Sequence, residues 1–330
     1  MYDFRLTDSF KRRLNYLRVS ITDRCNLNCC YCEPRKRISL LSHDQILRYE
    51  EILRLVRIFV QMGVDKVRVT GGEPLVRKGV YEFIKRLAGM HGLKDVSLTT
   101  NAICLAKNLE RIKDSGIKRI NISLDTLNRE KFAKITGYDS FDTVWNGITK
   151  AYEAGFSPIK LNTVVLKGVN DDELADLAAL SFTYPFHIRF IEYMPMGSCS
   201  RTVERSLLAP EIIKRIRSLG ELVPVRRDAC DGPARRFKFV GAKGEIGVIS
   251  AMSEHFCHEC NRLRLTAAGS LRTCLLSGHS VDLKGPMRAG SSDEELSAII
   301  MEAVRHKQAE HELNLDSCRR VCDQMSSIGG

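Results

Sequence analysis

The chain has 330 residues, is 44% hydrophobic and carries a formal net charge of +11 at pH 7. This hydrophobic content can bury a sizeable core, which excludes a disordered chain. No apolar run approaches the length of a membrane span, so we expect no membrane partner. Twelve cysteines, with a polar N-terminal segment that has no signal-peptide stretch, indicate a reducing, cytoplasmic compartment and metal or redox use.

Strand and helix patterns alternate up to about residue 195. Strands are predicted over residues 16–22, 66–70, 95–100, 119–124, 159–166 and 187–193. Helices are predicted over 44–62, 80–90, 105–115 and 171–180, with further helical stretches up to about 154. This succession indicates an α/β fold with a parallel sheet and right-handed crossovers. We expect an incomplete (β/α)6 barrel of the TIM type. A flat doubly wound sheet is the alternative, although the first loop lacks the glycine-rich pattern of its dinucleotide-binding version.

The regular alternation of strand and helix patterns ends at about residue 210. The patterns predict a helix over 211–219, hairpins formed by 235–240 with 245–250 and by 262–266 with 270–275, and a helix over 293–307. We therefore predict two parts: a partial barrel over 1–208, and a hairpin and helix extension over 209–330 that closes the barrel. The polar segment 318–330, with its Gly-Gly tail, is expected to be flexible.

The first loop carries three cysteines, Cys25, Cys29 and Cys32, at spacings of four and three. Three thiolates on one tight loop can hold three irons of a cubane iron–sulfur cluster. No fourth cysteine follows at a regular spacing, so one iron is left open to bind a small molecule. A structural zinc knot is the alternative, but zinc sites usually close with four ligands at paired spacings. We expect the additional Cys30 to be a bystander.

A second cysteine triad lies in the extension and consists of Cys257, Cys260 and Cys274. It also lacks an obvious fourth cysteine, which indicates a second cubane with an open iron. Zinc is again the alternative, because a nearby histidine could complete a site; the candidates are His255, His258 and His279.

Positive charges recur in the predicted strands. Lys66 and Arg68 share a face because side chains of a strand alternate with period two, and the same holds for Arg262 and Arg264. Charges in core strands are costly unless they are paired. Arginine binds phosphate well because its planar guanidinium can donate two parallel hydrogen bonds to it. The same placement recurs at Arg18, Lys160 and Arg189. We predict a polyanion in the mouth of the barrel. A solvent-facing strand side is the alternative for any single residue.

The loops that follow the strands carry most of the remaining signals. Gly71-Gly72-Glu73-Pro74 follows the second strand, and its glycines permit a close approach of the backbone to a ligand. The cysteine loop, this glycine loop, residues 99–101, residues 123–125 and Met194 all lie at the carboxyl ends of strands. Barrels place their function at that end.

Together these motifs resemble the GTP 3′,8-cyclase family, the radical S-adenosylmethionine (SAM) enzymes that open molybdenum cofactor biosynthesis. The resemblance runs nearly end to end. It is carried by residues 22–34, 68–74, 99–101, 123–125, 189–195, 231–235 and 257–265, with Cys274 and residues 328–330. The spacing of the first triad indicates only the superfamily, whereas the pattern around the second triad and the final Gly-Gly indicate the family.

The resemblance implies roles for individual residues. Cys25, Cys29 and Cys32 would hold the 4Fe–4S cluster that binds and reduces SAM, and Cys257, Cys260 and Cys274 would hold a second 4Fe–4S cluster that meets the guanine base. Contacts to SAM are implied for Tyr31, Gly72, Ser123 and Met194. Contacts to GTP are implied for Arg18, Arg68, Thr99, Lys160, Arg189, Arg262 and Arg264, with Lys66 as a further candidate. Gly329 and Gly330 match a tail that reaches into the active site.

The resemblance also implies the reaction, that of a lyase. Cleavage of SAM gives a 5′-deoxyadenosyl radical, which removes hydrogen from the ribose C3′ of GTP, and the new radical attacks guanine C8. A low-potential donor of the flavodoxin or ferredoxin type would supply electrons, and cyclic pyranopterin monophosphate synthase would act downstream. A homodimer is left open, and nucleic acid is not an expected partner.

Two other readings stay open from the residues. One is a different radical SAM enzyme with an auxiliary cluster, acting on a peptide or on RNA, because the net charge suits RNA equally well. The other is an iron–sulfur electron carrier or a basic nucleic-acid-binding module. Closed clusters and scattered surface charge would support the second of these.

Overall fold

The computed structural model describes residues 5–32, 40–196, 206–226, 232–311 and 325–329. Its first strands are β1 (Tyr16–Ser20), β2 (Lys66–Thr70), β3 (Asp95–Thr100), β4 (Ile120–Ser123), β5 (Ile159–Val165) and β6 (His187–Glu192). The helices that connect them are α1 (Tyr49–Gln61), α2 (Val80–Ala88), α3 (Leu109–Asp114), α4 (Arg129–Thr136), α5 (Phe141–Glu153) and α6 (Leu174–Thr183). This alternation matches the predicted strand and helix succession closely.

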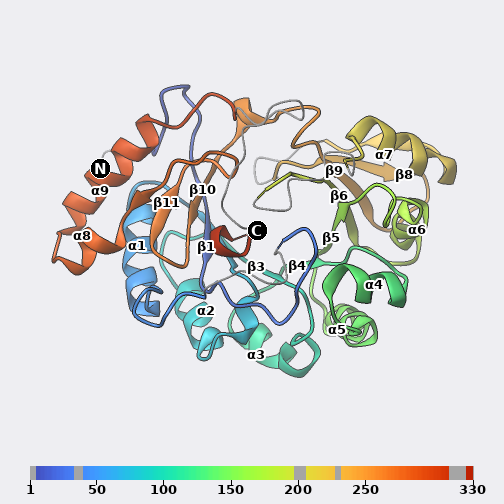
Figure 1. Ribbon diagram of the computed structural model, residues 1–330, viewed down its shortest axis with the longest axis horizontal. Coiled ribbons are helices and arrows are strands. Elements are labelled where there is room, and N and C mark those ends of the chain that lie inside the picture. The colour runs from blue at the N-terminus through green and yellow to red at the C-terminus, as the bar shows by residue number, and fades with distance from the viewer. Residues whose placement is uncertain (1–4, 33–39, 197–205, 227–231, 312–324, 330) are drawn as a thin grey trace.

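The strands β1 to β6 pair in chain order, each parallel to the next, which confirms the predicted parallel sheet. Figure 1 shows the connecting helices along the outer side of this curved sheet. The structure is consistent with a partial barrel, because the strand order within the described residues runs from one free edge to another without closing.

The remaining strands extend the sheet at both edges. They are β7 (Leu222–Pro224), β8 (Arg235–Phe239), β9 (Glu245–Ile249), β10 (Arg262–Leu265), β11 (Ser270–Arg272) and β12 (Val281–Asp282). β10 pairs in parallel with β1, and β9 pairs in parallel with β6. The predicted hairpins are confirmed as the antiparallel pairs β8–β9 and β10–β11. The first triad, on the loop after β1, and the second triad, around β10, therefore come from neighbouring strands.

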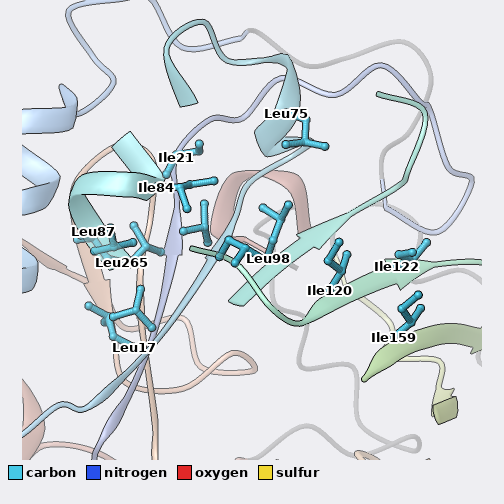
Figure 2. Close-up of a cluster of buried hydrophobic side chains, with 14 of the residues drawn as sticks. Leu17, Ile21, Leu75, Ile84, Leu87, Leu98, Ile120, Ile122, Ile159 and Leu265 are labelled. Carbon is cyan, nitrogen blue, oxygen red and sulfur yellow. The ribbon is translucent and has the colours of Figure 1, made fainter. Parts of the chain in front are cut away.

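Strand alternation separates an apolar face from a polar face. In β5 the buried Ile159 and Leu161 alternate with Lys160 and Asn162, which line a cavity on the inner side of the sheet. Figure 2 shows Ile159 on the apolar face with residues of other strands and with Ile84 of α2. Burying the apolar face against the helices removes apolar surface from water. Because side chains alternate along a strand, the polar residues between the apolar ones then face the inside of the barrel.

The start of α1 differs from the prediction. The pattern predicted a helix from residue 44, but α1 begins at Tyr49. The backbone N–H of Leu47 donates to the carbonyl of Ala267 at 2.9 Å, and the carbonyl of Leu47 accepts from Arg77. These contacts hold Leu47 in non-helical backbone against the β10–β11 connection, and they compete with intrahelical hydrogen bonds.

The end of the described chain forms a short helix that packs against the rest of the fold. The helices α7 (Ala209–Ile216), α8 (Lys284–Arg288), α9 (Asp293–Arg305) and α10 (Met325–Ile328) complete the fold. Ile328 of α10 is 3% exposed and packs in a small apolar cluster with Met196, Met252 and Leu276. Helix α10 lies within the segment 318–330 that was expected to be flexible; residues 318–324 and Gly330 lie outside the described residues. Figure 1 places α10 on the inner side of the sheet.

None of the helices in the described part of the chain has the length and apolar character that crossing a bilayer requires.

Candidate active site

One cavity of about 310 Å³ on the inner side of the sheet is lined by both cysteine triads. Every residue to which the sequence assigned a SAM or GTP contact also lines it: Tyr31, Gly72, Ser123, Met194, Arg18, Arg68, Thr99, Lys160, Arg189, Arg262 and Arg264. Lys66 lines it too, whereas Cys30 is not among its lining residues. Residues from eight strands and both cysteine loops thus converge on one space.

The first cysteine loop is pinned to the end of α4. The backbone N–H groups of Asn28 and Cys30 donate to the carbonyls of Thr136 and Ile135, each at 2.8 Å. Cys25 Sγ accepts from the backbone N–H of Leu27 at 3.4 Å. A hydrogen-bond donor to sulfur suits a metal-bound thiolate, because it offsets the negative charge. Among described residues these cysteines form no disulfide.

The glycine loop closes on the cysteine loop. A Cβ at Gly72 would lie 2.4 Å from the carbonyl oxygen of Arg24, and one at Gly71 would lie 2.8 Å from that of Thr22. The N–H of Gly72 donates to Thr22 O at 2.7 Å. The sequence suggested that these glycines admit a ligand. In the described residues, the close approach they permit is to the chain's own loop before Cys25.

Two buried carboxyl groups, neither of which had a predicted role, support this end of the cavity. Glu73 accepts from the N–H of Asn101 at 2.6 Å and from Thr100 Oγ1 at 2.8 Å, and burial raises its pKa to about 7. Asp125 accepts from Tyr31 Oη at 2.6 Å, and burial raises its pKa to about 6. Both residues belonged to the motifs of the resemblance, and an acidic residue within three positions of the end of a buried strand was the available signal. They fix the orientation of the loops that carry Tyr31 and Asn101.

The second triad lies beside β10. Burial raises the pKa of Cys260, but the charges of Arg262 and Lys307 outweigh it and bring this pKa down to about 7. Its thiol is therefore readily deprotonated, as a metal ligand must be. The pKa of Cys257 is raised by burial, partly offset by a hydrogen bond from the backbone N–H of His311.

Neither triad has the geometry of a mononuclear zinc site. In the described residues, no three His, Cys, Asp or Glu side chains lie close enough to share one metal ion. His258 is exposed, and His255 Nδ1 lies 3.1 Å from the carbonyl of Ala251 while its ring packs on His311. A cubane spreads its three cysteines over three irons, so their sulfurs need not converge on one point. The donor sets fit iron–sulfur clusters better than zinc.

Between the triads the cavity wall is cationic. Arg18 of β1 lies opposite Arg68 of β2 on one side and Arg264 of β10 on the other. Burial, and then the neighbouring Arg68 and Arg262, lower the pKa of Arg18 to about 10. Burial and the charges of nearby cations lower the pKa of Lys160 to about 6. Buried cations that repel one another are stabilised by an anion of several charges placed between them.

Two hydroxyl groups in this wall lack a hydrogen-bond partner within the part of the chain that the structure describes. The hydroxyls of Tyr16 and Thr99 are buried and have no hydrogen-bond partner among the described residues. Lys66 Nζ lies 4.8 Å from the centre of the Tyr16 ring. Burial raises the pKa of Tyr16, but Arg68, Arg18 and further cations outweigh it and lower this pKa. Tyr16 was not among the site residues predicted from the sequence, although it shares a strand face with Arg18. A buried polar group without a partner is costly, so both hydroxyls are available to hydrogen-bond a molecule bound in the cavity.

Comparisons with known proteins agree with this geometry. Residues 19–180 match the family model of the Radical SAM superfamily, and residues 186–313 match that of Molybdenum Cofactor Synthesis C. A GTP 3′,8-cyclase of Pelotomaculum thermopropionicum is 47% identical over 98% of this chain and 100% of its own length. The corresponding protein of Moorella thermoacetica is also 47% identical, with the same coverage of both chains.

Solved structures show the same fold at low identity. Streptococcus suis SuiB bound to precursor peptide SuiA superposes with a TM-score of 0.62 at 12% identity, over 91% of this chain and 67% of that chain. SuiB bound to S-adenosylmethionine gives a TM-score of 0.59 at 14% identity, over 79% of this chain and 60% of that chain. On its full-length similarity to the curated relatives, the chain belongs to the GTP 3′,8-cyclase family within the radical SAM superfamily.

Proposed function

We propose that the chain is a radical SAM lyase that converts GTP to (8S)-3′,8-cyclo-7,8-dihydroguanosine 5′-triphosphate, the first step of molybdenum cofactor biosynthesis. The observation that carries this proposal is that two cysteine triads line one cavity whose wall between them is cationic. The names of the curated relatives and the C-terminal family match support it.

The first triad is the proposed site of the SAM-binding cluster. Cys25, Cys29 and Cys32 hold a 4Fe–4S cluster, and the contacts to SAM come from Tyr31, Gly72, Ser123 and Met194. The bound cluster and SAM supply the radical that takes a hydrogen atom from the substrate. The chain's own contribution is orientation: Asp125 holds the Tyr31 hydroxyl, and the glycine loop fixes the backbone before Cys25.

The cationic wall is the proposed site of GTP. Its triphosphate lies against the basic side chains of β1, β2, β5, β6 and β10, with Thr99 as a further hydrogen-bond partner. These residues are Arg18, Lys66, Arg68, Lys160, Arg189, Arg262 and Arg264. Cys257, Cys260 and Cys274 hold the second 4Fe–4S cluster, which receives the guanine. Binding both ends of the nucleotide holds its ribose at a fixed place between the triads, which is the main way an enzyme assists such a reaction.

Several expectations from the sequence complete the proposal. Residues 1–208 form the radical SAM barrel and residues 209–330 the region that carries the second cluster. Electrons come from a flavodoxin or a ferredoxin in the cytoplasm, and the product passes to cyclic pyranopterin monophosphate synthase. A pull-down with each candidate donor, followed by an assay with that donor as the only reductant, tests the electron source.

The reaction is tested by anaerobic incubation of the reconstituted protein with SAM, dithionite and GTP. The proposal expects 5′-deoxyadenosine together with a cyclised nucleotide, and neither with ATP in place of GTP. A peptide- or RNA-modifying enzyme would be indifferent to GTP. A Cys257→Ala variant should keep the first cluster, seen as about four irons per chain, but form no cyclised nucleotide.

A further inference from the structure

The segment after α9, to which the sequence gives no role, lies against the second cysteine triad. Lys307 is only 3% exposed. Its Nζ lies 3.7 Å from Cys260 Sγ, and it also donates to the carbonyl of Thr273, the residue before Cys274. One buried ammonium group thus contacts one cysteine of this triad and the residue that precedes another.

A buried ion pair holds this segment in place. Arg12 Nε lies 2.5 Å from Asp8 Oδ2. The guanidinium of Arg12 donates to the carbonyls of Gln308 and Ala309 at 2.6 and 2.7 Å, and to the carbonyl of Cys257 at 2.7 Å. The position of Lys307 is therefore set by the fold. Its contact with Cys260 Sγ loses less side-chain entropy than the ordering of a freely mobile lysine would.

Lys307 differs from the other cation beside Cys260. Arg262 lines the cavity, so a bound triphosphate would compensate its charge. Lys307 is not among the cavity-lining residues, and its neighbours are the cysteine and carbonyl groups. Its charge acts on the triad whether or not a nucleotide is bound.

We propose that Lys307 tunes the reduction potential of the second cluster through its hydrogen bond to Cys260 Sγ; this rests on the proposed function, since it requires that cluster. One-electron reduction adds a negative charge to a cluster. A buried cation and an N–H···S hydrogen bond stabilise the reduced form more than the oxidised form, and so raise the potential. Lys307 is a positioning residue in this account, because it acts through a ligand and touches no substrate.

The test compares three variants of the reconstituted full chain by EPR-monitored redox titration. The second cluster is followed through the signal that SAM does not change. Lys307→Met should shift its midpoint potential to more negative values. Lys307→Arg keeps a hydrogen-bond donor and a positive charge, so its midpoint potential should lie close to that of the wild-type protein. The matched control is Lys284→Met, because Lys284 Nζ donates to a carbonyl, that of Gln45, away from the cavity; it should leave the potential unchanged.

The outcomes separate this inference from the function on which it rests. A Lys307→Met protein that keeps about eight irons per chain but titrates at the wild-type potential overturns the inference. If that variant fails to assemble, pulsed EPR on wild-type protein grown with ¹⁵N-lysine decides: a nitrogen coupling to the second cluster that Lys307→Arg removes supports the inference, and its absence overturns it. Wild-type protein with only about four irons would overturn both the inference and the two-cluster function.

Discussion

The carbonyl oxygen of Gly329 accepts a hydrogen bond from Arg264 Nη1 at 2.5 Å. Arg264 is 4% exposed and lies opposite Arg18 across the β1–β10 pair. Residue 329 is therefore held directly beside the proposed phosphate site. It has a φ of +76°, and a Cβ there would lie 3.0 Å from side-chain atoms of both Ser20 and Thr70. Only glycine fits this position without displacing the strands or Arg264.

Gly329→Ala should weaken GTP binding. The added methyl group must move the backbone away from Ser20 and Thr70, which breaks the hydrogen bond to Arg264. A hydrogen bond to a charged group contributes about 1.5–3 kcal/mol, so we expect KM for GTP to rise about tenfold or more with the iron content unchanged. The matched control is Gly241→Ala, at φ +80° with open space around it. Equal effects of the two substitutions on KM would refute the crowding argument.

Tyr16→Phe should remove one hydrogen bond to the triphosphate. The Tyr16 hydroxyl is buried and lacks a partner among the described residues, while its ring contacts Lys66 and Arg68. Phenylalanine keeps the ring, so the expected change is a rise of about 3- to 30-fold in KM for GTP with kcat nearly unchanged. Steady-state kinetics of this variant beside Tyr138→Phe, where the wild-type residue is exposed, provide the measurement. An unaltered KM would show that the hydroxyl meets no substrate.

Lys160 should make GTP affinity depend on pH. Burial and neighbouring cations lower its pKa to about 6 in the free protein. We expect a bound triphosphate to raise this pKa, because an anion stabilises the charged form. The protonated form is the one that binds, so affinity is highest below that pKa and falls as the pH rises above it, by at most about tenfold per unit. Lys160→Arg stays charged throughout and should flatten this decline. The measurement is KM for GTP from about pH 6 to about pH 8, and parallel profiles for the two proteins would contradict the assignment.

Cys30→Ser should retain both clusters. Cys30 does not line the cavity, and its backbone N–H, which serine keeps, donates to the carbonyl of Ile135 at 2.8 Å. Cys32→Ser is the comparison and should lose the first cluster, about half of the iron. Iron and sulfide analysis of both variants checks this. Loss of iron from Cys30→Ser would make Cys30 a ligand.

The local patterns of the sequence predicted the strands well. In β5, the alternation of Ile159 and Leu161 with Lys160 determined both the strand and the side that faces the cavity. Such alternation reflects burial on one face, which is a property of the segment itself. The grouping of the cysteines also predicted two triads, because ligand spacing is a local feature.

Features set by distant contacts were not predictable in this way. The start of α1 depends on the hydrogen bond between Leu47 and Ala267, and the short strands β7 and β12 exist only by pairing with neighbours. Lys307 reaches Cys260 from a segment with no motif of its own. The orientation of Gly329 depends on its hydrogen bond with Arg264 of β10, so it could be predicted only once the position of β10 was known. No window of sequence contains both members of such a pair.

The central claim is that one cavity holds a radical source at the first triad and the ribose of GTP between the triads. Its most direct test is an anaerobic single-turnover reaction with GTP that carries deuterium at C3′, followed by mass spectrometry of the 5′-deoxyadenosine. The account predicts that deuterium from C3′ appears in this product. Unlabelled 5′-deoxyadenosine, formed at the same rate with and without GTP, would contradict it.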